Sequence, residues 1–384
     1  MEFAQIYKFT NDAVKEVLGE TAVVNEDLSN IVDIGTAIFN ANAGDKYVKA
    51  LVDKIGKVVF VDRVYRSKAP KVLMDGWTYG QVLQKIDSEL PEASVNETFE
   101  LQDGVSYDPN VFHAPKVTEK FFSKRVTFEV DVSIADRQVR GAFNSASEMG
   151  RFISMIYTKA ENAITLRLDK LIHATICSAI AQTYHADIGA STPSETSGVK
   201  AINLLKLYND ASGDNLTASN CLSNLAFLKF ASVKVMEVSD HLTDYSKLFN
   251  VGGTDKFTPK ADQMIILLSD FKRASDGYLQ SDTYHNELVK LPDASLVSFW
   301  QGSGTSYALS DVAKIDVKTA DGITTSIPMV LGTIFDRNTL GVCCLDRRVT
   351  TQYNGKAEFT NYFYKFDAGY FNDMNENMVV FFVA

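Results

Sequence analysis

A long continuous stretch from Ala146 to Tyr184 has the pattern of a single unbroken helix. No proline occurs between Pro115 and Pro193, and apolar residues recur from Met149 onward at steps of one, three and four, which is one stripe on a helical period. Ser145 and Glu148 have the spacing of a capping box that would begin this helix. At about 1.5 Å per residue it would be roughly 58 Å long, more than an ordinary small domain needs. Such a helix is typical of a thin, extended subunit rather than of a compact enzyme.

The composition of the chain is that of a globular protein with an acidic balance. Its 384 residues predict about two or three domains. Hydrophobic residues make up 46% and charged residues 22%, which is enough apolar material for a core and argues against general disorder. The net charge is −10, and no basic stripe runs along the sequence. Tight binding to the phosphates of duplex DNA is therefore not expected.

The cysteines and the hydropathy give no sign of secretion or of a membrane span. Four cysteines lack the C-x-x-C spacing and lie in apolar or helical patterns, so we expect reduced, buried thiols: Cys177, Cys221, Cys343 and Cys344. The N-terminus has no basic region followed by an apolar core, and no run of eighteen apolar residues occurs.

No catalytic, cofactor-binding or metal-binding residues are predicted. The five histidines are scattered, without an H-E-x-x-H pair. The glycine clusters at 252–254 and 302–305 lack the lysine of a phosphate-binding loop, and G-x-S-x-G is absent. These glycines are interpreted as turns.

Two regions have little apolar material of their own. Residues 1–45 show no single apolar face and are interpreted as an arm that gains order by lying on another surface. Residues 67–115 hold four of the eight prolines and many acidic side chains. A long excursion with so weak a core predicts a projecting flap that a neighbour completes.

Elsewhere the patterns alternate between helix and strand. Residues 126–133 alternate apolar and polar side chains, which predicts a strand with one buried face. An amphipathic helix is expected over 199–208, a buried central strand over 264–268, and a final buried strand over 378–383. The sequence therefore favours an α/β or α+β module after the long helix.

The flap region carries a charge asymmetry, because an acidic segment (87–103) precedes a basic one (116–125). One interpretation is a hairpin whose two arms neutralise each other. The other is a flap whose charges meet opposite charges on adjacent copies, where they would set register more than affinity. The candidate inter-subunit residues are Asp87, Glu89, Glu92, Lys116, Lys120, Lys124 and Arg125.

The order of these parts resembles the major capsid protein fold of tailed bacteriophages, which encapsulin shells and herpesvirus capsid floors share. Three places carry the likeness. They are the approach to the flap (Asp33–Gly35 and Leu51–Val59), the spine helix (Phe152–Leu171) and the returning tail (Asn361–Tyr364 and Asn377–Phe381). Local sequence is most similar to the major head proteins of small short-tailed Bacillus phages.

The resemblance implies an α+β fold with a long spine helix, a peripheral (P) domain and an axial (A) lobe. The expected segments are an N-terminal arm with the approach to the flap (1–60), an extended β-flap or E-loop with peripheral strands (61–133), the spine helix and peripheral domain (134–216), the axial domain (217–345) and a returning peripheral β-tail (346–384).

The function implied by the resemblance is a major capsid protein of the virion, assembled in the host cytoplasm. Copies would self-assemble as hexamers and pentamers into an icosahedral or prolate head around double-stranded DNA, without sequence-specific binding. A portal protein at one vertex and a separate scaffolding protein are the implied partners, because the N-terminal arm is too short for a fused scaffold. Two alternatives stay open: an encapsulin-like compartment shell, and an α/β enzyme with an inserted flap, for which no nucleophile and base converge.

Overall fold

The computed structural model describes most of the chain outside residues 51–81 and 136–145. The described residues are 3–19, 23–25, 29–41, 43, 44, 46, 47, 50, 72, 82–88, 90, 91, 93, 95, 96, 99, 102–106, 108, 110, 112–135, 146–189, 196–282, 294–301, 308–318, 322 and 324–384. They divide into two compact units. The first contains residues 1–70, 125–172 and 342–369, and the second contains 71–124, 173–341 and 370–384.

The long helix is confirmed as α5, Ala146–Ile188, which extends four residues beyond the expected end. It contributes to both units, with the change between Ile172 and His173. Most described side chains of the apolar stripe are buried, including Ile164, Leu168 and Ile176, and Ala163 and Leu171 are half-buried. The proposed capping box lies outside the described side chains.

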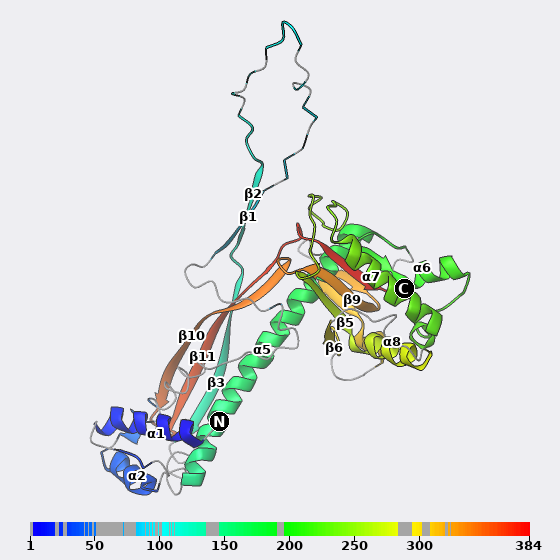
Figure 1. The fold of residues 1–384 in the computed structure, drawn as a ribbon. Helices are drawn as coiled ribbons and strands as arrows, with labels where there is room; N and C mark the ends of the chain where they lie inside the picture. Colours follow the sequence, from blue (N-terminus) through cyan, green and yellow to red (C-terminus); the bar gives the residue numbers. More distant parts are fainter. Residues whose placement is uncertain are drawn as a thin grey trace. The chain divides into compact units, whose positions relative to one another are not determined.

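The first unit is built on a three-stranded antiparallel sheet in the order β10-β11-β3 (Figure 1). Its strands are β3 (Arg125–Ala135), β10 (Leu340–Asn354) and β11 (Phe359–Asn372). The predicted alternation is confirmed in β3, whose even-numbered residues from Val126 to Ile134 are the less exposed ones. Ile164 and Leu168 of α5 pack on this face against Phe366 of β11.

Two N-terminal helices complete the core of the first unit. They are α1 (Phe3–Leu18) and α2 (Ile31–Asn40). Ala13, Val14 and Ile38 are fully buried in one cluster with Tyr362 of β11 and Ala160 of α5. The expectation that residues 1–45 lack an apolar face is therefore wrong. The face is short and made partly of small residues, and its partners, among them Ala160 and Tyr362, lie far along the sequence.

The second unit contains a five-stranded mixed sheet in the order β4-β12-β9-β5-β6. Its strands are β4 (Ala201–Asn203), β5 (Gln263–Leu268), β6 (Ser295–Val297), β9 (Val330–Asp336) and β12 (Met378–Phe382). Strands β5 and β12 confirm the two buried strands that the sequence predicts. Every residue of β9 and β12 is buried, which explains the continuous apolar run of β12.

Helices and shorter strands surround this sheet. They are α6 (Leu204–Ser212), α7 (Leu225–His241), α8 (Ser269–Asp282), the 3-10 turn η3 (Cys221–Ser223), the short helix α9 (Leu309–Val312) and the pair β7 (Ile315–Lys318) and β8 (Thr324–Ile327). The helix expected over 199–208 is partly wrong, because β4 precedes α6. Asn203 explains the boundary: it ends the strand and its side chain caps the helix by accepting from the Lys206 N–H.

The observed units divide the chain differently from the five expected segments. The returning tail was expected to belong to one domain over 346–384. Instead, β11 lies in the three-stranded sheet and β12 lies inside the five-stranded sheet. The α+β fold class itself is confirmed. All four cysteines are free, with three buried and Cys344 half-buried.

Candidate functional site: an anchored two-stranded ribbon

Two strands of the predicted flap form an antiparallel ribbon in the second unit. They are β1 (Leu83–Ser88) and β2 (Val117–Phe122), and they lie side by side in Figure 1. Alternate residues face opposite sides of such a ribbon. Leu83, Lys85 and Asp87 share the inward, less exposed face, whereas Ile86 of β1 and Phe121 of β2 share the outward face.

The inward face is held to a turn between β11 and β12 by two lysines. Lys85 Nζ donates to Asp373 Oδ2 at 2.7 Å and to Glu376 Oε1 at 2.5 Å. Lys120 Nζ, from the position opposite Lys85, donates to Asp373 Oδ1 at 2.8 Å. The Asp373 and Glu376 side chains are only 2% and 9% exposed, so these ion pairs are shielded from water far more than ordinary surface pairs.

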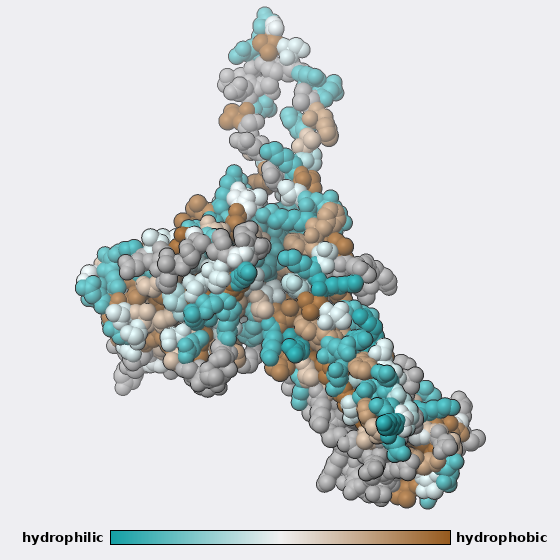
Figure 2. Space-filling model, turned by 180° about the vertical axis from the view of Figure 1, so that it is seen from behind, coloured by the Kyte–Doolittle hydropathy of each residue, from teal (hydrophilic) through white to brown (hydrophobic). Residues whose placement is uncertain are grey.

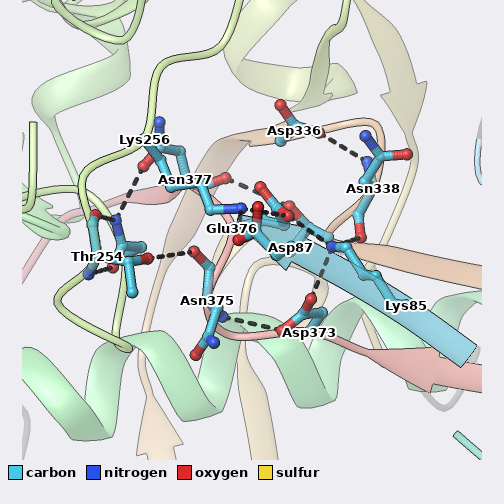
Figure 3. A network of polar contacts seen from close by, with 12 residues as sticks. Lys85, Asp87, Thr254, Lys256, Asp336, Asn338, Asp373, Asn375, Glu376 and Asn377 are labelled. Atoms are coloured by element: carbon cyan, nitrogen blue, oxygen red, sulfur yellow. Dashed lines mark hydrogen bonds and ion pairs between the residues drawn. The ribbon is translucent and has the colours of Figure 1, made fainter. Parts of the chain in front are cut away.

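A third lysine, Lys256, ties the ribbon to a neighbouring loop. Its ammonium pairs with Asp87 of β1 and donates to Glu376 Oε1 at 3.1 Å (Figure 3). One oxygen of Glu376 therefore accepts from two lysines, Lys85 and Lys256. We call the six residues Lys85, Asp87, Lys120, Lys256, Asp373 and Glu376 the ribbon anchor.

The turn at 373–377 is itself rigidly built. The Asp373 N–H donates to the Thr339 carbonyl at 2.6 Å, and Asp373 Oδ1 also accepts from the Asn375 N–H at 3.1 Å. Gly252 of the adjacent loop donates to the Met374 carbonyl, and a Cβ at Gly252 would lie 2.2 Å from Asn375 Oδ1. A side chain at position 252 would have to displace the Asn375 amide, so the loop lies closely against the turn.

A further buried carboxyl lies beside the anchor, on the turn after β9. Asp336 is 5% exposed and accepts from the Thr258 hydroxyl at 2.9 Å and from the Asn338 N–H at 2.8 Å. Burial raises the pKa of Asp336, and the negative charge of Glu376 adds to this rise, although the two hydrogen bonds oppose it.

The lysine contacts shift the pKa values of the anchor itself. Burial alone would raise the pKa of Asp373. The hydrogen bonds from Lys120 and Lys85 outweigh this effect, so the pKa lies below its ordinary value. Burial lowers the pKa of Lys256, but the hydrogen bond to Asp87 and the charge of Glu376 outweigh it and hold the pKa above its ordinary value. Both shifts favour the charged forms, so the anchor is an ion-pair network at neutral pH.

The outward face of the ribbon is apolar and open to solvent in the single chain. Ile86 is 65% exposed, Phe121 63% and Val117 54%. Further apolar side chains, in the part of the sequence that connects β1 to β2, are more exposed still, with Phe99 and Phe112 both at 85%. Figure 2 shows hydrophobic residues, in brown, on this segment of the chain. Large exposed apolar side chains in such number mark an interaction surface.

Comparison with known protein families gives one match over nearly the whole chain. The model of the Phi29-like phage major capsid protein matches residues 10–382. The chain belongs to this family. It is a phage major capsid protein, a structural component of the virion that forms the shell of the phage head.

Solved structures agree on the fold. The capsid structure of Staphylococcus phage Andhra matches with a TM-score of 0.52 at 11% identity, covering 84% of this chain and 86% of that one. A chain in the structure of the head fiber and inner core protein gp22 of native bacteriophage P68 matches with a TM-score of 0.51 at 10% identity, with the same two coverages. No curated protein matches the chain.

Two features are absent from the described part of this capsid protein. No group of three or more His, Cys, Asp or Glu side chains is placed to hold a metal ion there. None of the described helices has the length and apolar character needed to cross a bilayer.

The structure brings two of the predicted charged residues into the ribbon anchor. Asp87 and Lys120 both lie in the ribbon anchor, where their partners are Lys256 and Asp373 of the same chain rather than each other. The picture of a hairpin whose own arms neutralise each other is therefore wrong for these two residues. Glu89 and Glu92 lie outside the described residues.

The other three predicted cations lie away from the anchor contacts. Lys116 immediately precedes β2. Lys124 follows β2, and its carbonyl accepts from the Tyr370 N–H at 3.2 Å. Arg125 begins β3, opposite Gly369. The structure contains a single chain, so the inter-subunit role of these three residues stays a prediction.

Four anchor residues escaped the sequence analysis: Lys85, Lys256, Asp373 and Glu376. The only local signal was the polar run 372–377 between two apolar strands, which marks a turn. That turn lies 288 residues from its partner Lys85, and no pattern in a single sequence connects the two.

Proposed function

We propose that this major capsid protein joins its neighbours in the head shell through the outward face of the β1–β2 ribbon. The face consists of Ile86, Val117 and Phe121, and a second copy of the same chain is its partner. The observation that carries the proposal is their exposure, because an isolated ribbon has no reason to present three large apolar side chains to water.

A second copy is the partner that best fits this face. A shell is made of many copies of one chain, so every copy carries the same ribbon at the same place. Burying a side chain such as Phe121 or Ile86 contributes about 1.5–3 kcal/mol. Because each contact recurs around the shell, modest contacts of this size add up to a stable particle.

The charged residues are proposed to act at the edge of the same contact. Lys116, Lys124 and Arg125, with Glu89 and Glu92 on the acidic side, would meet opposite charges on adjacent copies and set their register. Asp87 and Lys120 serve this purpose indirectly, because their charges are already used within the chain.

The contents and partners of the shell follow as further parts of the proposal. The head encloses double-stranded DNA without sequence-specific contacts, and the net charge of −10 keeps the wall from holding the phosphates. A separate scaffolding protein and a portal at one vertex complete the assembly. The protein acts structurally and not as an enzyme. The family match favours a phage head over an encapsulin-like compartment.

The test is the double variant Ile86→Ser/Phe121→Ser, with assembly measured by sedimentation. The yield of particles should fall at least about tenfold, while the free energy of unfolding of the unassembled chain stays within about 0.5 kcal/mol, because both side chains are already exposed. Val233→Ser, an exposed apolar residue of α7, is the matched control and should assemble normally. Normal particles from the double variant would contradict the proposal.

A further inference from the structure

The inward face of the ribbon carries charges of opposite sign in a fixed order. Along β1, Lys85 faces the carboxylates of Asp373 and Glu376, and two residues later Asp87 faces Lys256. The receiving surface therefore has the complementary order, negative and then positive. Figure 3 shows these side chains converging from the ribbon, the 373–377 turn and the 250–258 loop.

This order of charges excludes the neighbouring registers of the ribbon on its own chain. A slip of two residues moves the strand by about 6.6 Å and keeps the same face inward. Depending on its direction, it would bring Asp87 against Asp373 and Glu376, or Lys85 toward Lys256. Like charges held together at a site this buried are strongly unfavourable.

A slip of one residue is excluded for another reason. It would turn the inward face outward, so that Ile86 would point at the carboxylates and Lys85 would lose both of its partners. Asp373 would then be buried without compensating charge, which is far more costly than an unpaired surface charge, and Glu376 would keep Lys256 but lose Lys85.

The ribbon also makes an aromatic contact with β11. The ring centroids of Phe122 in β2 and Phe371 in β11 lie 5.0 Å apart. A single aromatic pair tolerates small shifts, whereas hydrogen-bonded charges fix both distance and direction.

We infer that the charge order Lys85–Asp87 is a register key, and that these two side chains are positioning residues for the shell contact. They select one seating of the ribbon on its own chain and so decide which side chains it presents to the next copy. The inference rests on the proposed function of the outward face and deepens it. The neighbouring copy contacts Ile86 and Phe121, and the ion pairs of Lys85 and Asp87 hold these two side chains in position.

The experiment reverses the order without changing the charge. The variant Lys85→Asp/Asp87→Lys keeps the composition of β1 and the net charge of the chain. Its matched control is Lys247→Asp/Asp255→Lys, which reverses an exposed ion pair whose two members are not anchor residues. The conservative variant Lys85→Arg keeps the sign at its position.

Two readouts are measured for each variant. In the unassembled chain, hydrogen exchange of the β1 and β2 amides should accelerate at least about tenfold in the reversed variant, with exchange of the five-stranded sheet unchanged. Its yield of sedimenting particles should fall at least about tenfold. The control and Lys85→Arg should match the unaltered protein in both readouts.

Each outcome decides a different statement. Unchanged ribbon exchange in the reversed variant overturns the register key. Fast exchange with normal particles also overturns it, because the seating is then not needed for assembly. Faster exchange of the five-stranded sheet as well would mean that the residues only stabilise the fold, which contradicts a positioning role. The serine variants of the outward face decide the proposed function separately, since they leave every anchor residue in place.

Discussion

The N-terminal helices and the β1–β2 ribbon are held in opposite ways. From the sequence, the first region is interpreted as an arm that lies on another surface, and the second as a flap that a neighbour completes. The helices α1 and α2 instead bury Val14, Ile31 and Ile38 against their own unit. The ribbon buries charges on one face and leaves the apolar side chains of the other face in solvent.

The difference shows what each kind of contact is suited for. Apolar burial is non-directional and holds a segment in place without fixing its register strongly. Hydrogen-bonded ion pairs contribute less net stability, because desolvation offsets much of the attraction, but they specify position. A segment that must present one defined face to a neighbour is better held by the second kind.

The largest expected effect comes from the apolar side of this comparison. Replacing the fully buried Ile38 of α2 by alanine should lower the free energy of unfolding by about 2–4 kcal/mol, since it removes buried methyl groups and leaves a cavity. The control Val32→Ala, on the exposed face of the same helix, should change it by less than about 0.5 kcal/mol. Denaturant titration measures both. Equal, small effects would show that α2 does not pack as part of this core.

The second effect comes from removing the central carboxylate of the anchor. Asp373→Asn should cost about 1–3 kcal/mol, because it removes the shared partner of Lys85 and Lys120. Hydrogen exchange should localise the loss to β1 and β2. Asp255→Asn, in an exposed pair, is the control. A loss spread evenly over the five-stranded sheet would contradict the assignment of Asp373 to the ribbon.

A third effect is the pH dependence of the free energy of unfolding on the acid side. The folded pKa of Asp373 is lowered, so its contribution is present above the unfolded value of about 3.9 and is lost as pH falls through the folded value. The folded pKa of Asp336 is raised, so protonation of this group stabilises the fold as pH falls toward about 3.9.

The opposite contributions of Asp373 and Asp336 to the pH dependence of stability can be separated by mutation. Asp373→Asn should flatten the loss of stability below about pH 4, whereas Asp336→Asn should remove the gain that precedes it. Denaturant titrations across the acid range measure both slopes. Identical pH profiles for the two variants and the unaltered protein would show that neither carboxyl is linked to folding in this way.

The smallest effect is expected from an exposed pair on the three-stranded sheet. Lys365 lies 3.5 Å from Glu129 across β11 and β3, and both side chains are substantially exposed. Lys365→Ala should change the free energy of unfolding by no more than about 0.5 kcal/mol. A loss of several kcal/mol would mean that charge pairs outside the anchor also fix the fold, and the contrast drawn above would weaken.

Periodic elements of the fold were predictable because each one carries its own pattern. The stripe of α5 and the alternation of β3 are visible locally and are confirmed. The buried strands β5 and β12 were also correctly predicted from their apolar runs. The prediction for α6 begins five residues early because the short strand β4 merges into the helix without a break in hydropathy.

Long-range partners were not predictable in the same way. The first helices read as an arm because Tyr362 and Tyr364, which cover them, lie near the other end of the sequence. The flap was recognised as unusual, and its charges Asp87 and Lys120 were singled out, but the carboxylates that bind its lysines are 253 to 291 residues away. Family resemblance supplied the function where pairwise contacts were out of reach.

The most direct test of the account is the accessibility of Ile86 before and after assembly. The variant Ile86→Cys places a thiol on the outward face, while the native cysteines are buried or half-buried and provide the background. The account predicts that a maleimide labels this thiol rapidly in the unassembled chain and at least about tenfold more slowly in complete shells. Equal labelling in both states would show that no neighbouring copy covers the ribbon, and would contradict the account.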